Sequence, residues 1–308
     1  MNMKKKVLAM IMAAVVLSTL LMGCGSESKT PDDVNPDSSA MVSTETETAA
    51  VEETESAGSS KTTLDEKEIY NNNGIVVTVT GMDNGLMGTD ISVHVQNSTD
   101  QNILITAKDI SVNDYMMAQA GLYVEVAAGK AANDNLCLYA SELEECGIET
   151  IAEIEFFLVV SDNETWEEID TSQLVTLTTS VGADFVQTVD DTGDVMYDSN
   201  GVRVICKGLK DDLIWSGSVV FYMENNTDRA LSVYAENVSV NGYMEDVSLW
   251  SDMQPGKRAV QGMSIIDLSD LGIENIDEID EIEFSLRIVD ADTWEDIAST
   301  DTMTLHFE

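Results

Sequence analysis

The sequence predicts an all-β chain in which one antiparallel sandwich domain occurs twice. The first sign is a nearly end-to-end repeat. Residues 69–82 (IYNNNGIVVTVTGM) align with 196–209 (MYDSNGVRVICKGL), and 154–169 (IEFFLVVSDNETWEEI) align with 282–297 (IEFSLRIVDADTWEDI). The second is a period-two alternation of apolar and polar residues in both copies, which indicates strands with one buried face. The third is the lack of helical periodicity beyond the N-terminal segment, apart from one short turn in each copy.

Strands are expected where both copies are apolar at every second position, because such positions are predicted to lie in a core. The rows are Ile75, Val77 and Val79 with Val202, Val204 and Cys206; Ile91, Val93 and Val95 with Val219, Phe221 and Met223; and Ile154, Phe156, Leu158 and Val160 with Ile282, Phe284, Leu286 and Ile288. Seven or so strands per copy, with polar turns between them, predict two tandem immunoglobulin-like sandwiches. The Cys…Trp…Cys spacing of antibody domains is absent from the sequence.

The turns between these strands carry recognisable signals. Asn241-Gly242 in the phrase SVN-G-Y fits a type I′ hairpin, whose two central residues need positive φ, and Asn113-Asp114 is a less favourable version of the same turn. One helical turn per copy is expected at 141–148 and 267–273, each ended by a glycine. Because the duplication copied strands and turns together, we interpret the repeated SVN-x-Y phrase as scaffold.

Residues 1–23 predict an export signal, with a basic start and an apolar run shorter than the ~20 residues that span a bilayer. The ending Leu21-Met22-Gly23-Cys24 resembles the lipobox of bacterial lipoproteins. That resemblance implies that Cys24 is lipidated and holds the chain on the extracytoplasmic face of the cell membrane, since two acyl chains suffice for stable anchoring. A plain cleaved signal is the alternative.

The rest of the chain divides into four segments. Residues 24–65, which begin with the lipidated cysteine, are rich in Ser, Thr and Glu, and are expected to form a disordered tether. The first repeat is predicted at 66–180, a linker at 181–192 and the second repeat at 193–308. The predicted role of the tether is to hold the folded repeats away from the membrane.

The charge of the chain excludes some partners. With 57 acidic and 15 basic residues the net charge is −42, so the chain repels nucleic acid and anionic membrane surfaces. We interpret the acidity as a solvated surface rather than a specific site for a cationic partner.

Taken together, the LMGC ending, the acidic tether and the N-x-T-D and SVN-x-Y turns resemble those of Gram-positive bacterial surface lipoproteins with tandem immunoglobulin-like domains of unknown function. The resemblance covers most of the chain. It implies an extracytoplasmic location and a β-sandwich fold, and it supplies no catalytic residues.

Neither an enzyme site nor a cofactor site is predicted. His94 and His306 fall on outward positions without a counterpart in the other copy, which argues against a Ser-His-Asp arrangement. Acidic residues are too numerous for any pair to indicate a glycosidase. The Asp- and Asn-rich loops 71–74, 190–194 and 198–201 could supply calcium ligands, but turn chemistry explains them as well.

Three cysteines follow the predicted lipidation site. Cys146 and Cys206 align with apolar core positions and are expected to be buried thiols. A Cys137–Cys146 disulfide remains an alternative, although the second repeat has no counterpart. No spacing typical of a zinc site is present.

Aromatic residues are the candidate binding residues. Tyr123 and Trp250 align, and their apolar neighbours take the alternate positions, so both are predicted to lie on the face opposite the core. Trp215 lies in a loop. Exposed aromatic residues anchor many interfaces. The alternative is that the other domain or the second sheet covers these side chains. Trp166 and Trp294, in the shared T-W-E phrase, are expected in core or rim packing.

These observations favour a non-catalytic, membrane-anchored module that binds an unknown surface protein or glycan, or supports a complex. A solute-binding lipoprotein of a transporter is the alternative, although that class usually contains long helices. A surface hydrolase is a third hypothesis.

Overall fold

The computed structural model describes residues 62–182, 184–210, 217–245, 247, 249–265, 272–273 and 275–307. Cys24, the predicted signal peptide, Trp215 and the predicted tether up to residue 61 lie outside the described residues. No helix of the described part is long and apolar enough to cross a bilayer.

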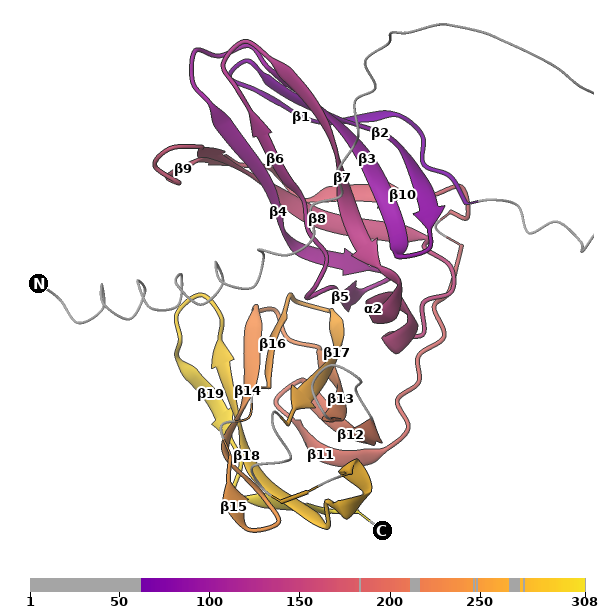
Figure 1. Cartoon of the computed structure of the whole chain (residues 1–308), viewed down its shortest axis with the longest axis vertical. Helices are drawn as coiled ribbons and strands as arrows, with labels where there is room; N and C mark the ends of the chain where they lie inside the picture. Colours follow the sequence, from indigo (N-terminus) through magenta and orange to yellow (C-terminus); the bar gives the residue numbers. More distant parts are fainter. Residues whose placement is uncertain are drawn as a thin grey trace, which may run out of the picture. The chain divides into compact units, whose positions relative to one another are not determined.

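Among the described residues, each repeat contains ten strand segments in the same order. Figure 1 shows how these elements follow one another along the chain. The first repeat has β1 (Lys67–Asn72), β2 (Ile75–Gly85), β3 (Gly88–Asn97), β4 (Ile103–Val112), β5 (Tyr115–Met116), β6 (Tyr123–Val126), β7 (Ala131–Tyr139), β8 (Glu153–Asp162), β9 (Glu168–Thr171) and β10 (Val175–Thr178). The second has β11 (Asp194–Ser199), β12 (Val202–Lys210), β13 (Ser218–Asn225), β14 (Leu231–Val240), β15 (Tyr243–Met244), β16 (Trp250–Met253), β17 (Arg258–Ser264), β18 (Glu281–Asp290), β19 (Asp296–Ser299) and β20 (Met303–His306). The number exceeds the predicted seven or so because long strands pair with short ones: β8 pairs with both β9 and β10, and β4 with both β5 and β6.

Within each repeat the strands form two antiparallel sheets. One sheet has the order β1-β2-β3-β7 in the first repeat and β11-β12-β13-β17 in the second. The other is centred on the pair β4·β8 or β14·β18, with the short strands at its margins. This arrangement confirms the predicted all-β fold of tandem antiparallel sandwiches. A parallel pairing of Tyr115 on β5 with Arg258 on β17 links the repeats.

Two hydrophobic cores lie between the sheets, one in each repeat. The predicted alternation is present. Buried and half-buried side chains alternate along β2 from Ile75 to Val79 and along β18 from Ile282 to Ile288. Cys206 and Cys146 are buried, as predicted. Leu64, near the end of the predicted tether, is also buried in the first core. The two repeats also pack against each other, because the side chain of Tyr222 in the second repeat is part of the core of the first repeat.

The SVN-x-Y phrase forms the predicted hairpin in both repeats. Asn241 and Gly242 have φ of 49° and 79°, and Asn113 and Asp114 have φ of 48° and 69°, as a type I′ turn requires. In each repeat the Asn side-chain oxygen accepts two backbone N–H groups at or just before the start of β8 or β18, at 2.9 and 3.1 Å. The phrase is therefore scaffold that ties a hairpin to a central strand.

The N-x-T phrase is a second shared piece of scaffold. Asn97 and Asn225 are buried, and each donates from its amide nitrogen to three backbone carbonyls within 2.8–3.2 Å. Each amide oxygen accepts the backbone N–H and the hydroxyl of the Thr two residues on, at 3.0 and 2.7 Å. A buried asparagine pairs the loop carbonyls that strands leave unsatisfied.

The predicted helical turn of the first repeat is α2 (Ala140–Glu145). Gly147 follows with φ of 64°, and Ile148 donates its N–H to the carbonyl of Leu143 at 2.8 Å, which is the expected C-terminal cap. In the second repeat, residues 267–271 of the matching turn lie outside the described residues. Gly272 has φ of 71°, and a 3-10 turn, η2, follows at Ile276–Glu278.

Candidate functional site

The aligned aromatics Tyr123 and Trp250 lie on the outer faces of β6 and β16, as predicted. Their side chains are 50% and 42% exposed, while the residues on either side of them are buried. The alternative that another domain or sheet covers them does not hold within the described residues.

Of the two positions expected for Trp166 and Trp294, core or rim, the structure shows the rim. Both have positive φ, 62° and 63°, in the turn after β8 or β18, and their side chains are 63% and 53% exposed. Their backbone N–H groups donate to the backbone carbonyls of Asp162 and Asp290, at 2.9 and 2.8 Å. The turn therefore directs each indole outward at the rim.

The rim tryptophans lie beside the aligned aromatics. In the first repeat the ring centroids of Tyr123 and Trp166 are 6.4 Å apart. In the second repeat, Trp250 contacts Trp294 at 5.6 Å and stacks on Tyr234 at 5.3 Å with an angle of 10° between the rings. We call these two groups the aromatic rows of the first and second repeats.

The row of the second repeat is longer because of two substitutions between the copies. Tyr234 on β14 pairs with Trp250 on one side and Arg287 on the other, and the Arg287 guanidinium lies 5.6 Å from the Tyr234 ring centroid. The matching residues of the first repeat are Thr106 and Val159. Sequence reasoning missed Tyr234 and Arg287 because it looked for positions the copies share, whereas these differ.

Charged groups fix the row of the second repeat. Trp250 donates its indole N–H to the Asp252 carboxylate at 2.9 Å. Arg287 donates to Asp296 at 2.5 Å and to Glu236 at 3.4 Å. Hydrogen bonding to Asp296, with further support from Tyr234 and Glu236, raises the pKa of Arg287, so the guanidinium stays charged over the Tyr234 ring.

A second group of polar residues lies where the repeats meet. Lys257 donates to Asp114 at 2.8 Å and to Glu155 at 2.5 Å, and the carboxylate of Glu153 lies within 4.8 Å of both acids. Burial would lower the pKa of Lys257, but its hydrogen bonds to the two carboxylates outweigh burial and raise it. Three clustered acids suit a cation, and here a lysine ammonium supplies the charge.

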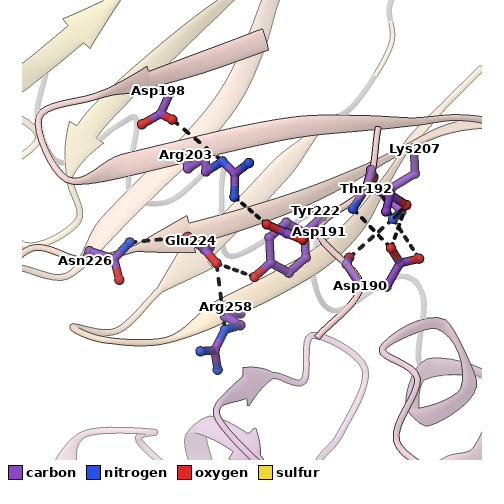
Figure 2. Close-up of polar contacts among 10 residues, drawn as sticks. All are labelled: Asp190, Asp191, Thr192, Asp198, Arg203, Lys207, Tyr222, Glu224, Asn226 and Arg258. Atoms are coloured by element: carbon purple, nitrogen blue, oxygen red, sulfur yellow. Dashed lines mark hydrogen bonds and ion pairs between the residues drawn. The ribbon is translucent and has the colours of Figure 1, made fainter. Parts of the chain in front are cut away.

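A cavity of about 600 Å³ adjoins this junction, between α2, β5, the segment before β11 and the sheet β12-β13-β17. The rings of Tyr115 and Tyr222 line it, with centroids 6.4 Å apart. The Tyr222 hydroxyl donates to Glu224 Oε1 at 2.5 Å, and the Arg258 guanidinium lies 4.0 Å from the same oxygen (Figure 2). Burial, followed by the Glu224 hydrogen bond, raises the pKa of Tyr222, so its hydroxyl stays protonated.

The acidic side chains of loop 190–194, a candidate calcium site, form ion pairs with two basic side chains of the protein (Figure 2). The Asp190 carboxylate lies 2.9 Å from the Lys207 ammonium, and Asp191 accepts from Arg203 at 2.7 Å. The other candidate loops, 71–74 and 198–201, are Asn-Gly hairpins with positive φ at both residues.

The cysteines and histidines show no arrangement for nucleophilic chemistry in the described part. Cys137, Cys146 and Cys206 are free thiols, so the alternative of a Cys137–Cys146 disulfide does not hold. Burial, mainly, raises the pKa of Cys146 to about 12 and that of Cys137 to about 11, which suppresses the reactive thiolate. His94 hydrogen-bonds to Asn133, and His306 is exposed near Glu281.

Comparisons with known proteins give only distant structural similarity. No protein-family model and no curated protein matches the chain. The YadV chaperone is similar over 76% of this chain and 100% of its own, with 12% identity and a TM-score of 0.23. A red sea bream transglutaminase is similar over 79% of this chain and 31% of its own (8% identity, TM-score 0.19), and Amycolatopsis orientalis exo-chitosanase CsxA over 70% and 25% (13% identity, TM-score 0.20). Likeness at this level carries no argument about fold, activity or ligand.

Proposed function

We propose that this chain is a non-catalytic lipoprotein, anchored to the cell membrane through Cys24 on the extracytoplasmic face, whose duplicated immunoglobulin-like sandwiches bind a surface protein or glycan. The proposal joins two kinds of support. The proposed cellular location rests on the LMGC ending and the acidic tether. The binding role rests on the aromatic rows.

The observation that carries the binding role is the same exposed aromatic pair at the same place in both repeats. Tyr123 with Trp166, and Trp250 with Trp294, present half-exposed rings on the outer face of a rigid sheet. Aromatic rings supply a large contact area at low entropic cost, and they dominate binding energy at interfaces. Two copies on one chain add avidity for a partner with repeated features.

The binding role is tested by cross-linking intact cells that carry the full chain and recovering its partner. Replacing Trp166 and Trp294 together by Ala is expected to reduce recovery at least tenfold, as loss of two anchors predicts. A matched control replaces the exposed Leu86 and Met87 of the β2–β3 loop by Ala. Equal recovery from both variants would remove the binding role from the aromatic rows.

Anchoring has a separate test. Cys24→Ser is expected to abolish lipid labelling and to release the chain from the membrane fraction. A chain that stays membrane-bound and is processed normally would contradict lipidation at this cysteine.

A second candidate function, solute binding for a transporter, draws on a different observation. The cavity of about 600 Å³ at the junction falls within the usual range for small-molecule sites. The cross-linking and Trp variants do not bear on it, so the two functions are distinguishable.

A further inference from the structure

The junction cavity contains an aromatic hydroxyl with no partner in the described part of the chain. Tyr115 is 2% exposed, lines the cavity, and has no hydrogen bond to its hydroxyl among the described residues. The ring is buried, but the hydroxyl itself is not among the buried atoms that lack a partner, so it is accessible to water or to a ligand in the cavity that Tyr115 lines. The matching Tyr243 of the second repeat is 64% exposed, where solvent satisfies its hydroxyl.

The walls of the cavity carry an excess of negative charge. Its lining includes Glu144, Glu145, Glu149 and Asp190, against a single ammonium from Lys207. Lys207 pairs with Asp190, and Lys210 pairs with Glu145. Glu144 and Glu149 are exposed and have no ion-pair partner within the described ranges, so two carboxylates at the cavity are available to a positive ligand.

Aromatic surface faces the same space. Tyr115, Tyr222 and Phe185 line the cavity together with the apolar side chains of Val220 and Val260. A cation in contact with aromatic rings gains attraction from their negative faces, and that attraction grows where water is displaced. A hydrated metal ion would use the carboxylates and gain little from the rings, whereas an organic cation would use both.

We propose that the junction cavity binds a small organic cation, an amine or quaternary ammonium compound, between the two repeats. The cationic group is balanced by Glu144 and Glu149, the apolar part lies against the rings of Tyr115, Tyr222 and Phe185, and the Tyr115 hydroxyl accepts a hydrogen bond from an amine or donates one to a ligand oxygen. This site rests on the second candidate function, solute binding in the junction cavity, whose ligand class it names, and it shares no residue with the aromatic rows.

The test measures binding of spermidine and of choline to the purified full chain by calorimetry, at about 150 mM salt, where long-range attraction to an acidic surface is screened. Saturable binding of at least one probe is expected, with a stoichiometry of one. Tyr115→Phe and Glu149→Gln are each expected to weaken the binding of an amine probe roughly tenfold, as loss of a hydrogen bond to a charged group predicts.

Matched controls separate the cavity from the acidic surface. Tyr243→Phe removes the equivalent hydroxyl of the second repeat, and Glu125→Gln removes an exposed carboxylate outside the cavity. Neither is expected to change the affinity. Absence of saturable binding by both probes, or equal weakening by the control variants, would overturn the proposal. Either result leaves the function proposed for the aromatic rows intact, because that is tested by the Trp variants.

Discussion

At the scale of single residues, the most constrained positions are polar ones that the duplication retained. Asn97 and Asn225 each satisfy three carbonyls and hold a threonine two residues on. Both also begin tripeptides, NST and NNT, that match a glycosylation acceptor, and burial makes these nitrogens inaccessible to such modification. Their repetition is therefore explained by loop geometry.

Asn225→Ala is expected to lower the free energy of unfolding by about 2–4 kcal/mol, because one buried and two part-buried carbonyls lose their donor. Urea denaturation of the full chain measures the change. The control is Asn226→Ala at the exposed neighbour, where an effect below about 0.5 kcal/mol is expected. Similar losses in the two variants would contradict the structural role assigned to Asn225.

Glu142 of α2 gives a pH-dependent prediction. Its side chain is buried, one oxygen accepts the N–H of Gln119, and the other has no hydrogen-bond partner among the described residues. Burial, above all, raises its pKa in the folded state from 4.5. The stability it contributes is therefore full below about pH 4.5 and is lost as the pH rises through the folded-state pKa.

Glu142→Gln, which stays neutral, is accordingly expected to make the unfolding free energy less dependent on pH above 4.5. Urea titrations at pH 5 and pH 8 measure this difference. The exposed neighbour variant Glu144→Gln should retain the dependence of the original chain, and an unchanged dependence in Glu142→Gln would refute the assignment.

At the scale of elements, the two repeats use the same strands with different outer faces. The exposed pair at β6 and β16 was predictable, because period-two alternation decides which residues face the core. For the tryptophans of the shared T-W-E phrase the sequence left core and rim open, because the turn of positive φ that directs them outward is seen only in the structure. The longer row of the second repeat depends on the register between β14, β16 and β18, which brings together residues far apart in the sequence.

Trp250→Ala is expected to cost more stability than Tyr123→Ala, about 1–3 against about 0.5–1.5 kcal/mol, because Trp250 contacts two rings and Tyr123 contacts one. Equilibrium unfolding of the two variants of the full chain gives the comparison. Equal costs would indicate that the stack on Tyr234 contributes little.

At the scale of the whole molecule, the junction between the repeats depends on residues in which the copies have diverged. Asp114 occupies a positive-φ turn position where the second repeat has Gly242, and its carboxylate contacts Lys257. Tyr115 is buried against Tyr222, whereas Tyr243 is exposed. The less favourable Asp in the hairpin is thus explained by a contact with the other repeat rather than by the turn itself.

Lys257→Met is expected to lower the unfolding free energy by roughly 1–3 kcal/mol, because it leaves clustered carboxylates without their cation at a half-buried site. The same substitution is expected to increase the rate of backbone amide hydrogen exchange in β5 and β17. The matched control is Lys130→Met, the aligned and exposed lysine of the first repeat, which should leave both measurements unchanged. Identical behaviour of the two variants would mean that the junction contact does not stabilise the repeats.

The sequence by itself determined the all-β class, the duplication, the buried rows and the hairpin turns, because these follow from period-two patterning and local turn chemistry repeated in two copies. It also located Tyr123 and Trp250 on the outer face. Only the tertiary structure decided that Trp166 and Trp294 project at the rim, that Lys257 occupies an acidic cluster, and that Tyr115 faces a cavity. The rim placement depends on a turn of positive φ at the tryptophan itself. The two outcomes at the junction depend on contacts between residues more than 100 positions apart, which have no local signature in the chain.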